Sequence, residues 1–311
     1  MLSRTAENLF WVTRYMERAE TMARLLEVGY RIALMPSTGE GNRSDWESII
    51  AASGDEGAFA EAHGVADEKS VEHYLMFDSE NPSSIASCIA RARDNARIVR
   101  TAVTSEVWDA LNSTFQEFKQ LRPGNLPELC DWTKKRAASV RGSIESTQLQ
   151  HDGYDFMNLG YYLERADNTA RLLDVKYYVL LPTTQRVGGS VDNYQWITLL
   201  RSLSALRSFH WTYGGDYSPN KIAHFLILNK TNPRSLLHCV EEASYHLNRL
   251  ARAYGQSTRA QTQANARLAR LAEARVDDVI ADGLHEFLGE FIAENAILGQ
   301  SVADGYLFGS N

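Results

Sequence analysis

Two stretches of the sequence carry the same pattern: LFWVTRYMERAETMARLLEV at residues 9–28 and FMNLGYYLERADNTARLLDV at residues 156–175. In both, apolar side chains recur at steps of three and four residues, which is the spacing of one face of an α-helix. Alanines stand within each apolar face and allow a neighbouring helix to approach closely. We therefore expect two long, matched helices that pack at a shallow crossing angle.

Three further markers repeat in the same order, at nearly the same offset of about 150 residues: Trp46 with Trp196, His73 with His224, and Cys88 with Cys239. Repetition of this kind is the signature of a tandem duplication. We predict an all-α protein, a single domain over 1–311, in which a repeat of about residues 1–150 and a repeat of about residues 151–311 form one large helical bundle. The two copies are expected to pack through a pseudo-two-fold axis.

Proline and asparagine mark the expected helix boundaries. Pro36 and Pro182 are expected to end the two long helices, and loops are expected at 37–44 and at about 53–64. Asn81 and Asn232 each precede a proline and are interpreted as N-caps, with the proline in the first helical position. The other expected helices cover residues 82–103, 105–120, 126–150, 190–210, 233–254, 258–275 and 277–301.

The composition is that of a globular protein, with 44% hydrophobic and 23% charged residues. A formal net charge of −7 disfavours a general nucleic-acid-binding surface. No apolar run approaches the roughly 20 residues that span a bilayer, and the first residues do not resemble a signal peptide. We therefore expect a cytoplasmic protein that binds neither nucleic acid nor membrane. The three cysteines are too few and too scattered for a disulfide framework or a tetrahedral zinc site.

The repeated motif places a Glu-Arg pair inside the most apolar helix of each half, at Glu17-Arg18 and Glu164-Arg165. Buried charges are costly unless they are paired and hydrogen-bonded. One interpretation is a structural network in which each pair engages the other across the halves. The other is a central polar pocket that receives an anionic or zwitterionic ligand such as a peptide carboxylate. Arg24 and Arg171 follow acidic residues by four positions, so local pairing is expected there.

The segment ARARDNARIVR at residues 90–100 places Arg93 and Arg97 on one helix face, with Asn95 nearby. This strip is either a solvated basic face or an anion-binding surface beside the Glu-Arg helices. The matching segment of the second half reads CVEEASYHLNRL, so the strip is not duplicated. A ligand site, if the chain has one, is expected to be single and close to Arg93 and Arg97.

Motifs of known metal, phosphate or nucleophile chemistry are missing from the sequence. It has no glycine-rich phosphate loop, no Gly-x-Ser-x-Gly, no His-Glu-x-x-His and no Glu-x-x-His. His73 and His224 stand among aromatic residues and are interpreted as packing contacts. Cys88 and Cys239 are interpreted as small buried side chains. We expect no metal and no cofactor.

The opening stretch MLSRTAENLFWVTRYMERAETMARLLEV, followed by ARARDNARIVR, SEVWDALN and YLERADNTARLLDV, resembles the bacterial alpha-E family, which is all-helical and named for its Glu-Arg motif. The resemblance covers nearly the whole chain. It implies an association with a circularly permuted ATP-grasp amide ligase, often with a transglutaminase-like peptidase, in systems predicted to make or modify small peptides. It implies no established activity for the alpha-E protein itself.

Two functions follow from these observations. The first is an accessory or substrate-presenting helical partner of the ATP-grasp ligase, because no complete catalytic constellation occurs. The second is an enzyme of peptide or amino-acid metabolism that uses Glu17 or Glu164 as a general base, since an apolar setting can tune a carboxylate pKa. The candidate ligand-binding residues for either function are Arg18, Arg24, Arg93, Asn95, Arg97, Arg165 and Arg171.

Overall fold

The computed structural model describes residues 1–34, 45–180 and 190–309. Within these ranges every regular element is a helix, which confirms the all-α prediction. Pro36, Pro182 and the loop expected at 37–44 lie outside the described residues. None of the helices in these ranges combines the length and apolarity that a membrane span requires.

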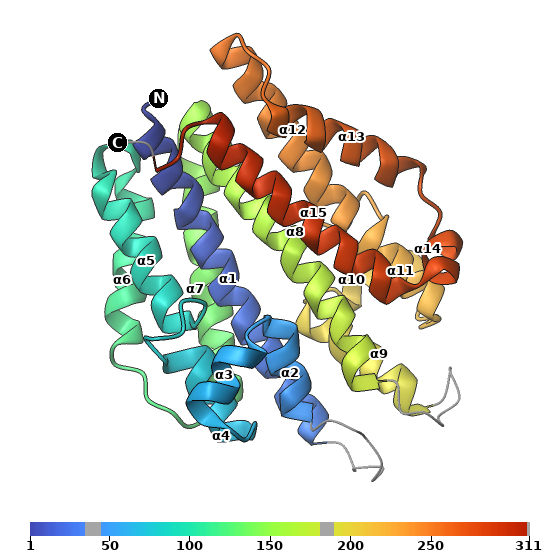
Figure 1. The fold of residues 1–311 in the computed structure, drawn as a ribbon. Coiled ribbons are helices and arrows are strands. Elements are labelled where there is room, and N and C mark those ends of the chain that lie inside the picture. The colour runs from blue at the N-terminus through green and yellow to red at the C-terminus, as the bar shows by residue number, and fades with distance from the viewer. Residues whose placement is uncertain (35–44, 181–189, 310–311) are drawn as a thin grey trace.

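Two long helices, α1 (Ser3–Ala33) and α8 (Asp152–Leu180), lie side by side and run in the same direction through the middle of the molecule (Figure 1). The Thr13 hydroxyl on α1 donates a hydrogen bond to the backbone oxygen of Met157 on α8 at 2.6 Å. Close by, a Cβ added to Gly160 would stand 2.2 Å from the backbone oxygen of Phe10. The two backbones can therefore approach this closely only because position 160 has no side chain.

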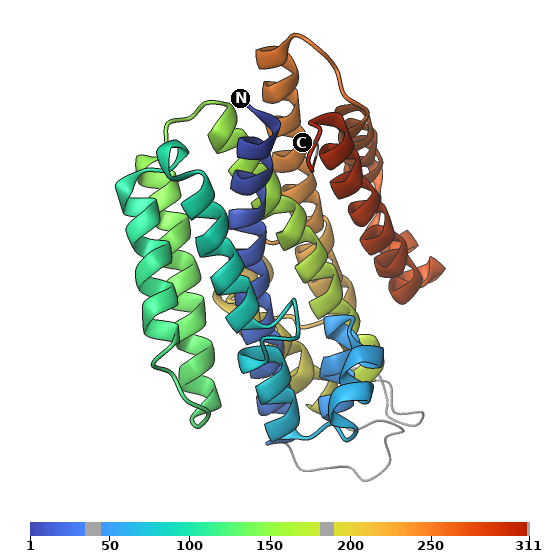
Figure 2. The same ribbon diagram turned by 60° about the vertical axis from the view of Figure 1, so that its left-hand side comes forward.

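Two helices pack on each long helix and a third packs on both of them, which completes a four-helix group. The helices around α1 are α5 (Ile85–Ile98), α6 (Ser105–Phe118) and α7 (Leu126–Thr147), and those around α8 are α12 (Leu236–Tyr254), α13 (Arg259–Glu273) and α15 (Leu284–Gly305). In the first group α6 packs on both α5 and α7, and in the second α13 packs on both α12 and α15. Figure 2 shows the two groups on opposite sides of the α1–α8 pair.

Short helices surround the C-terminal halves of α1 and α8, at the lower end of the molecule in Figure 1. On the side of α1 they are α2 (Asp45–Ser53), α3 (Glu56–His63), α4 (Glu68–Glu72) and the π-helical turn η1 (His73–Phe77), and on the side of α8 they are α9 (Ser190–Ser202), α10 (Leu206–Tyr213), α11 (Pro219–Ile227) and α14 (Val276–Asp282). A 3₁₀ turn, η2 (Arg100–Ala102), precedes α6.

The buried apolar side chains form two clusters, one toward each end of the long helices. Along α1 the first cluster ends at Met16 and the second begins at Ala19. Along α8 the first cluster ends at Leu163 and the second begins at Ala166. Both Glu-Arg pairs occupy the gap between the two clusters. A charged layer therefore crosses the bundle where α1 and α8 pack together.

The predicted N-caps at Asn81 and Asn232 are wrong. α5 and α12 are capped by Ser84 and Ser235, whose hydroxyls accept the backbone N–H three residues later at 3.1 Å in both helices. The asparagine amides instead donate to backbone oxygens seven residues earlier, at 2.9 Å in both cases. They tie the turn to the preceding helical segment, because an Asx side chain in an Asn-Pro turn can bond backbone on either side of it.

Some expected boundaries differ from the structure. The loop expected at 53–64 contains α3, and the helix expected over 190–210 is interrupted between α9 and α10. The helix expected over 277–301 is broken at Gly283, whose φ of 110° is incompatible with a right-handed helix. After each long helix, short helices are followed by three longer ones, although α14 has no counterpart between α6 and α7. The duplication itself stays a prediction.

Candidate functional site

The two Glu-Arg motifs pair with each other across the α1–α8 contact. Arg18 donates to both carboxylate oxygens of Glu164, from Nε at 2.6 Å and from Nη2 at 3.1 Å. Arg165 makes the same fork on Glu17, at 2.8 and 3.1 Å. Both glutamates are 2% exposed. The predicted pairing between the halves is therefore present, in the bidentate geometry that makes the strongest arginine–carboxylate contacts.

Further charged groups surround Glu17. Arg234, from the turn before α12, lies with Nη1 3.3 Å from Glu17 and Nη2 2.6 Å from Glu20. Arg24 pairs with Glu20 as expected and also donates to the backbone oxygen of Ser202. Burial by itself raises the pKa of Glu20, but Arg234 and Arg24 outweigh burial and hold that pKa well below its usual range. This side of the layer is a closed ionic cluster.

Arg234 was missed by the sequence analysis. It lies in a turn with no helical periodicity, and Ser83 occupies the position 151 residues earlier, which is the offset between His73 and His224. The only signal in the sequence is the Asn-Pro-Arg-Ser turn itself, which does not indicate that its arginine reaches a carboxylate on another helix.

Glu164 has a different third partner. Arg14, one turn before Arg18 on α1, donates from Nε to Glu164 at 2.8 Å. Burial opposes ionisation of Glu164, but Arg18 and then Arg14 outweigh it and lower its pKa to about 2. In turn the Glu164 carboxylate raises the pKa of Arg18 further above its ordinary value. Arg171 pairs with Asp167 at 2.6 Å, the local contact expected from their spacing.

The space beside Glu17 is small. A cavity of about 10 Å³ is lined by Glu17, Tyr161, Arg141 and apolar side chains, and this is room for about one water molecule. The Tyr161 ring faces the guanidinium of Arg165 at 4.2 Å and that of Arg141 at 3.9 Å. An amino-acid substrate does not fit there. The geometry gives the motif a structural role, because its ion pairs join α1 to α8. The catalytic role of its glutamates stays an untested prediction.

The strip on α5 does not reach the Glu-Arg pairs. Arg93 donates to Asn112 of α6 at 3.2 Å and lies 4.9 Å from the centre of the Phe115 ring. Arg97 is 63% exposed and lies 3.5 Å from the exposed carboxylate of Asp94. Arg97 is therefore solvated, whereas the Arg93 side chain is 20% exposed and packs on α6, and an anion-binding role of the strip stays a prediction. Asn95 is the member of the strip that turns toward α1.

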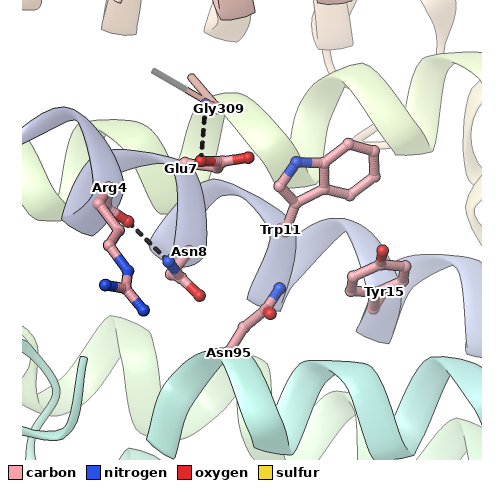
Figure 3. A pocket seen from close by; sticks show the side chains of 7 residues that line it. All are labelled: Arg4, Glu7, Asn8, Trp11, Tyr15, Asn95 and Gly309. Atoms are coloured by element: carbon pink, nitrogen blue, oxygen red, sulfur yellow. Dashed lines mark hydrogen bonds between the residues drawn. The ribbon is translucent and has the colours of Figure 1, made fainter. Parts of the chain in front are cut away.

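Asn95 lines a hollow between α5 and the first turns of α1 (Figure 3). The hollow has a volume of about 400 Å³, which lies in the range of small-ligand sites. Arg4, Asn8 and Asn95 point into the space between the two helices in Figure 3. The remaining lining residues are Glu7, Trp11, Tyr15 and Gly309.

The hollow combines polar groups without internal partners and an aromatic wall. Within the described residues, no hydrogen bond or ion pair is made by the Arg4 guanidinium, the Asn95 amide, the Trp11 indole N–H or the Tyr15 hydroxyl. Trp11 and Tyr15 stack with their ring centres 5.2 Å apart. Glu7 accepts the backbone N–H of Gly309 at 3.0 Å. Donors for a carboxylate thus stand beside a flat apolar surface.

The matching place in the second half is filled. The positions that correspond to Asn8 and Asn95 hold Asp155 and His246, whose Oδ1 and Nδ1 lie 2.8 Å apart. Arg249 donates to the same carboxylate oxygen at 2.7 Å. Both Asp155 and His246 are buried. The polar groups there satisfy one another, so the open hollow occurs on one side of the α1–α8 pair and lacks an equivalent at this matching position.

The cysteines offer no nucleophile. Burial raises the pKa of Cys88 and of Cys239 to about 12, so both side chains are thiols at neutral pH. This agrees with their interpretation as small buried residues.

Comparisons with known proteins point to one family. The sequence profile of the Alpha-E family, described as a predicted alpha-helical domain with a conserved ER motif, matches residues 1–307. Uncharacterized proteins of Mycobacterium bovis and of two strains of Mycobacterium tuberculosis are 26% identical over 324 aligned positions. The match covers 97% of this chain but 36% of each relative, so the chain spans about a third of their length. No solved structure gives a significant match. The chain belongs to the Alpha-E family.

Proposed function

We propose that the chain is a helical partner that presents a small peptide or amino acid to a circularly permuted ATP-grasp amide ligase in the cytoplasm. The hollow between α1 and α5 is the presenting surface in this proposal. A transglutaminase-like peptidase is the second partner implied by the family resemblance. The ligand is a carboxylate-bearing peptide terminus or amino acid, because the hollow supplies hydrogen-bond donors beside an aromatic wall.

One observation carries the proposal: the Asn8 and Asn95 side chains line an open hollow, while their counterparts Asp155 and His246 lie 2.8 Å apart and close the matching place. Polar groups near a protein surface normally find partners within the chain or in solvent. The Arg4 and Asn95 side chains share one concave surface with the stacked rings of Trp11 and Tyr15, and this combination is typical of a site that binds a polar ligand.

The length of the relatives supports a partnership. In the mycobacterial proteins the matching region is a minority of the chain, and about two-thirds of each relative consists of other sequence. In these relatives the matching region is joined to further sequence, and this supports the proposed association with another protein.

The alternative, an enzyme with a glutamate as its general base, has weaker support. A general base works best with a pKa near the operating pH, whereas paired arginines hold the pKa of Glu164 at about 2. Glu17 accepts two hydrogen bonds from Arg165 and lines a cavity with room for about one water molecule. A Glu17→Gln variant that folds and keeps full ligase stimulation would count against this alternative.

The proposal is tested with the cognate ligase and its peptide acceptor. Adding the wild-type chain should raise ligase turnover and the two proteins should co-purify. The Arg4→Ala/Asn95→Ala variant should raise the apparent KM for the acceptor about tenfold or more, because hydrogen bonds to a charged group contribute about 1.5–3 kcal/mol. The matched control is Arg97→Ala, an exposed residue on the same helix as Asn95.

Two results would contradict the proposal. One is a ligase that neither co-purifies with the chain nor responds to it between low and physiological salt. The other is an Arg4→Ala/Asn95→Ala variant that stimulates the ligase with the wild-type KM. A variant that has lost its cooperative thermal transition is replaced by Arg4→Gln/Asn95→Ser, which removes the same charge and replaces the amide by a shorter hydroxyl.

A further inference from the structure

Three side chains of the kind that ligate metals meet at the end of the molecule opposite the hollow, near α3 and α4 in Figure 1. His63 is the last residue of α3, His73 is the first residue of η1, and Asp78 directly follows η1. One potential ligand atom from each of the three residues lies within 4.8 Å of the other two. No other group of this kind occurs among the described residues.

The His63 ring is held in place but lacks a hydrogen bond at Nε2. It stacks on Phe59 with ring centres 5.3 Å apart and meets Tyr74 edge-on at 5.4 Å. Its buried Nε2 has no hydrogen-bond partner, and the nearest carboxylate oxygen, Oδ2 of Asp78, is 3.5 Å away. That separation is too long for a good hydrogen bond. It is close to the roughly 3.3 Å between two ligand atoms bound tetrahedrally to Zn²⁺.

The Asp78 carboxylate is oriented by the backbone around it. Its Oδ1 accepts the backbone N–H of Glu80 at 2.9 Å, which leaves Oδ2 directed at His63. The wide π-helical turn brings the ligands together, because the backbone N–H of Asp78 donates to the oxygen of His73 at 2.9 Å. Hydrogen bonds that orient ligand side chains from behind are a regular feature of metal sites, and π-helical turns are frequent at functional sites.

The matching positions of the second half hold one histidine and no carboxylate, and their side chains have hydrogen-bond partners. The positions about 150 residues later hold Tyr213, His224 and Asn229. The Tyr213 hydroxyl lies 2.5 Å from Nδ1 of His224, so that imidazole has a partner. The Asn229 side-chain oxygen accepts the backbone N–H groups of Thr231 and Asn232. Tyrosine and asparagine complete the network there, whereas the first half carries a second imidazole and a carboxylate.

We propose that His63, His73 and Asp78 bind one divalent transition-metal ion, with Zn²⁺ the best fit. Two imidazoles and a carboxylate are donors that Zn²⁺ favours, whereas Mg²⁺ and Ca²⁺ prefer oxygen ligands throughout. Three protein ligands leave a fourth position for water or another ligand. No metal was expected from the sequence, which lacks Glu-x-x-His, and His73 was interpreted as a packing contact. The three residues are spread over 16 positions and match no spaced metal motif.

The test is a titration of the purified, chelator-treated full chain with Zn²⁺ by calorimetry and with Co²⁺ by visible absorption. One ion per chain should bind, and Mg²⁺ alone should give no saturable signal. His63→Tyr and Asp78→Asn, which copy the second half, should each weaken binding by about 100-fold or more, since even changes behind a ligand weaken binding 10–100-fold. Binding should be unchanged in His151→Ala, which removes the histidine of a surface His–Asp pair with a 3.1 Å separation.

The outcome is decided by stoichiometry and by the variants. The proposal is overturned if the wild-type chain gives no saturable Zn²⁺ or Co²⁺ signal. It is also overturned if the Asp78→Asn variant binds the ion as tightly as the wild type. His73→Ala provides the safeguard against misfolding, because His73 is exposed and its loss leaves the core intact. Circular dichroism of each variant verifies the helical fold. The result does not depend on the proposed function, since the metal ligands and the hollow share no residue.

Discussion

Glu17 and Glu164 each accept an arginine fork while lying out of contact with water. Removing one partner of such a pair leaves an uncompensated buried charge, so Arg165→Met should lower the free energy of unfolding by about 3 kcal/mol. Adding Glu17→Gln should restore much of that loss. Urea unfolding of the wild type, the two single variants and the double variant measures the coupling energy.

The control for this cycle is Arg97→Met, at an exposed position where a change should stay within about 0.5 kcal/mol. A coupling energy near zero between positions 17 and 165 would mean that the fork does not staple α1 to α8.

Acid should weaken the protein through Glu164. Its pKa is about 2 in the folded chain against an ordinary value of 4.5, because Arg18 and Arg14 outweigh the burial that would raise it. The unfolded chain therefore binds a proton at a higher pH than the folded chain does. The stabilisation is complete above about pH 5 and is lost as the pH falls toward 2, a contribution on the order of 3 kcal/mol.

Urea unfolding at pH 6 and at pH 3 measures this loss. Glu164→Gln should be less stable than the wild type at pH 6 and should lose less stability between the two pH values. Glu20, whose pKa is also held low, keeps part of the acid sensitivity in this variant. An unchanged difference between pH 6 and pH 3 in Glu164→Gln would contradict the prediction.

The sequence predicted the paired residues but not the groups that complete the network. Glu17 and Arg165 are recognisable because their motif repeats on an apolar helix, where a charge needs a partner. Arg14 and Arg234 reach the same carboxylates only through the crossing of α1 with α8 and the turn before α12. Contacts of that kind depend on tertiary placement, and a single sequence contains no periodicity that reports it.

At the scale of the helices, the close approach of α1 and α8 depends on Gly160. An added Cβ would stand 2.2 Å from the backbone oxygen of Phe10 and 2.8 Å from Oγ1 of Thr13. The backbone cannot yield as a flexible side chain would, so Gly160→Ala should destabilise the protein by about 1–3 kcal/mol or more. Thermal and urea unfolding measure the change.

Gly142 supplies the matched control, because it is also a helical glycine and its Cβ would meet nothing within 4 Å. Gly142→Ala should be neutral or stabilising by up to about 1 kcal/mol, as helix propensity dictates. Equal effects of the two substitutions would show that helix propensity, and not the contact between α1 and α8, governs position 160.

Helix existence was predictable from periodicity, and helix boundaries were less so. The Asn-Pro-x-Ser turns contain two residue types that can cap a helix, and the structure uses Ser84 and Ser235. α3 lies in a stretch interpreted as a loop, since its eight residues are too few for an apolar period to emerge. The helix break at Gly283 requires a positive φ. Glycine permits this conformation, but the presence of a glycine does not by itself predict it.

For the whole molecule, the matching places on α1 and α8 provide a way to close the hollow by design. A triple variant would give the first half the residues found at the matching positions of the second half, which are Asp155, His246 and Arg249. Its substitutions are Asn8→Asp, Asn95→His and Ile98→Arg. The new contacts among these three side chains should fill the space between α1 and α5 and remove the Asn95 amide from the hollow. Acceptor-peptide affinity should therefore fall about tenfold or more, while the cooperative thermal transition is kept.

Calorimetry with the acceptor peptide, alongside circular dichroism, separates these effects. Ile98→Arg alone is the control, because Ile98 is exposed and this change adds the charge without the Asp–His pair. A triple variant that binds the peptide as tightly as the wild type would show that the ligand does not lie between α1 and α5. A triple variant that loses affinity while the Ile98→Arg control keeps it locates the ligand between these helices, since the two variants differ only at Asn8 and Asn95, which line the hollow.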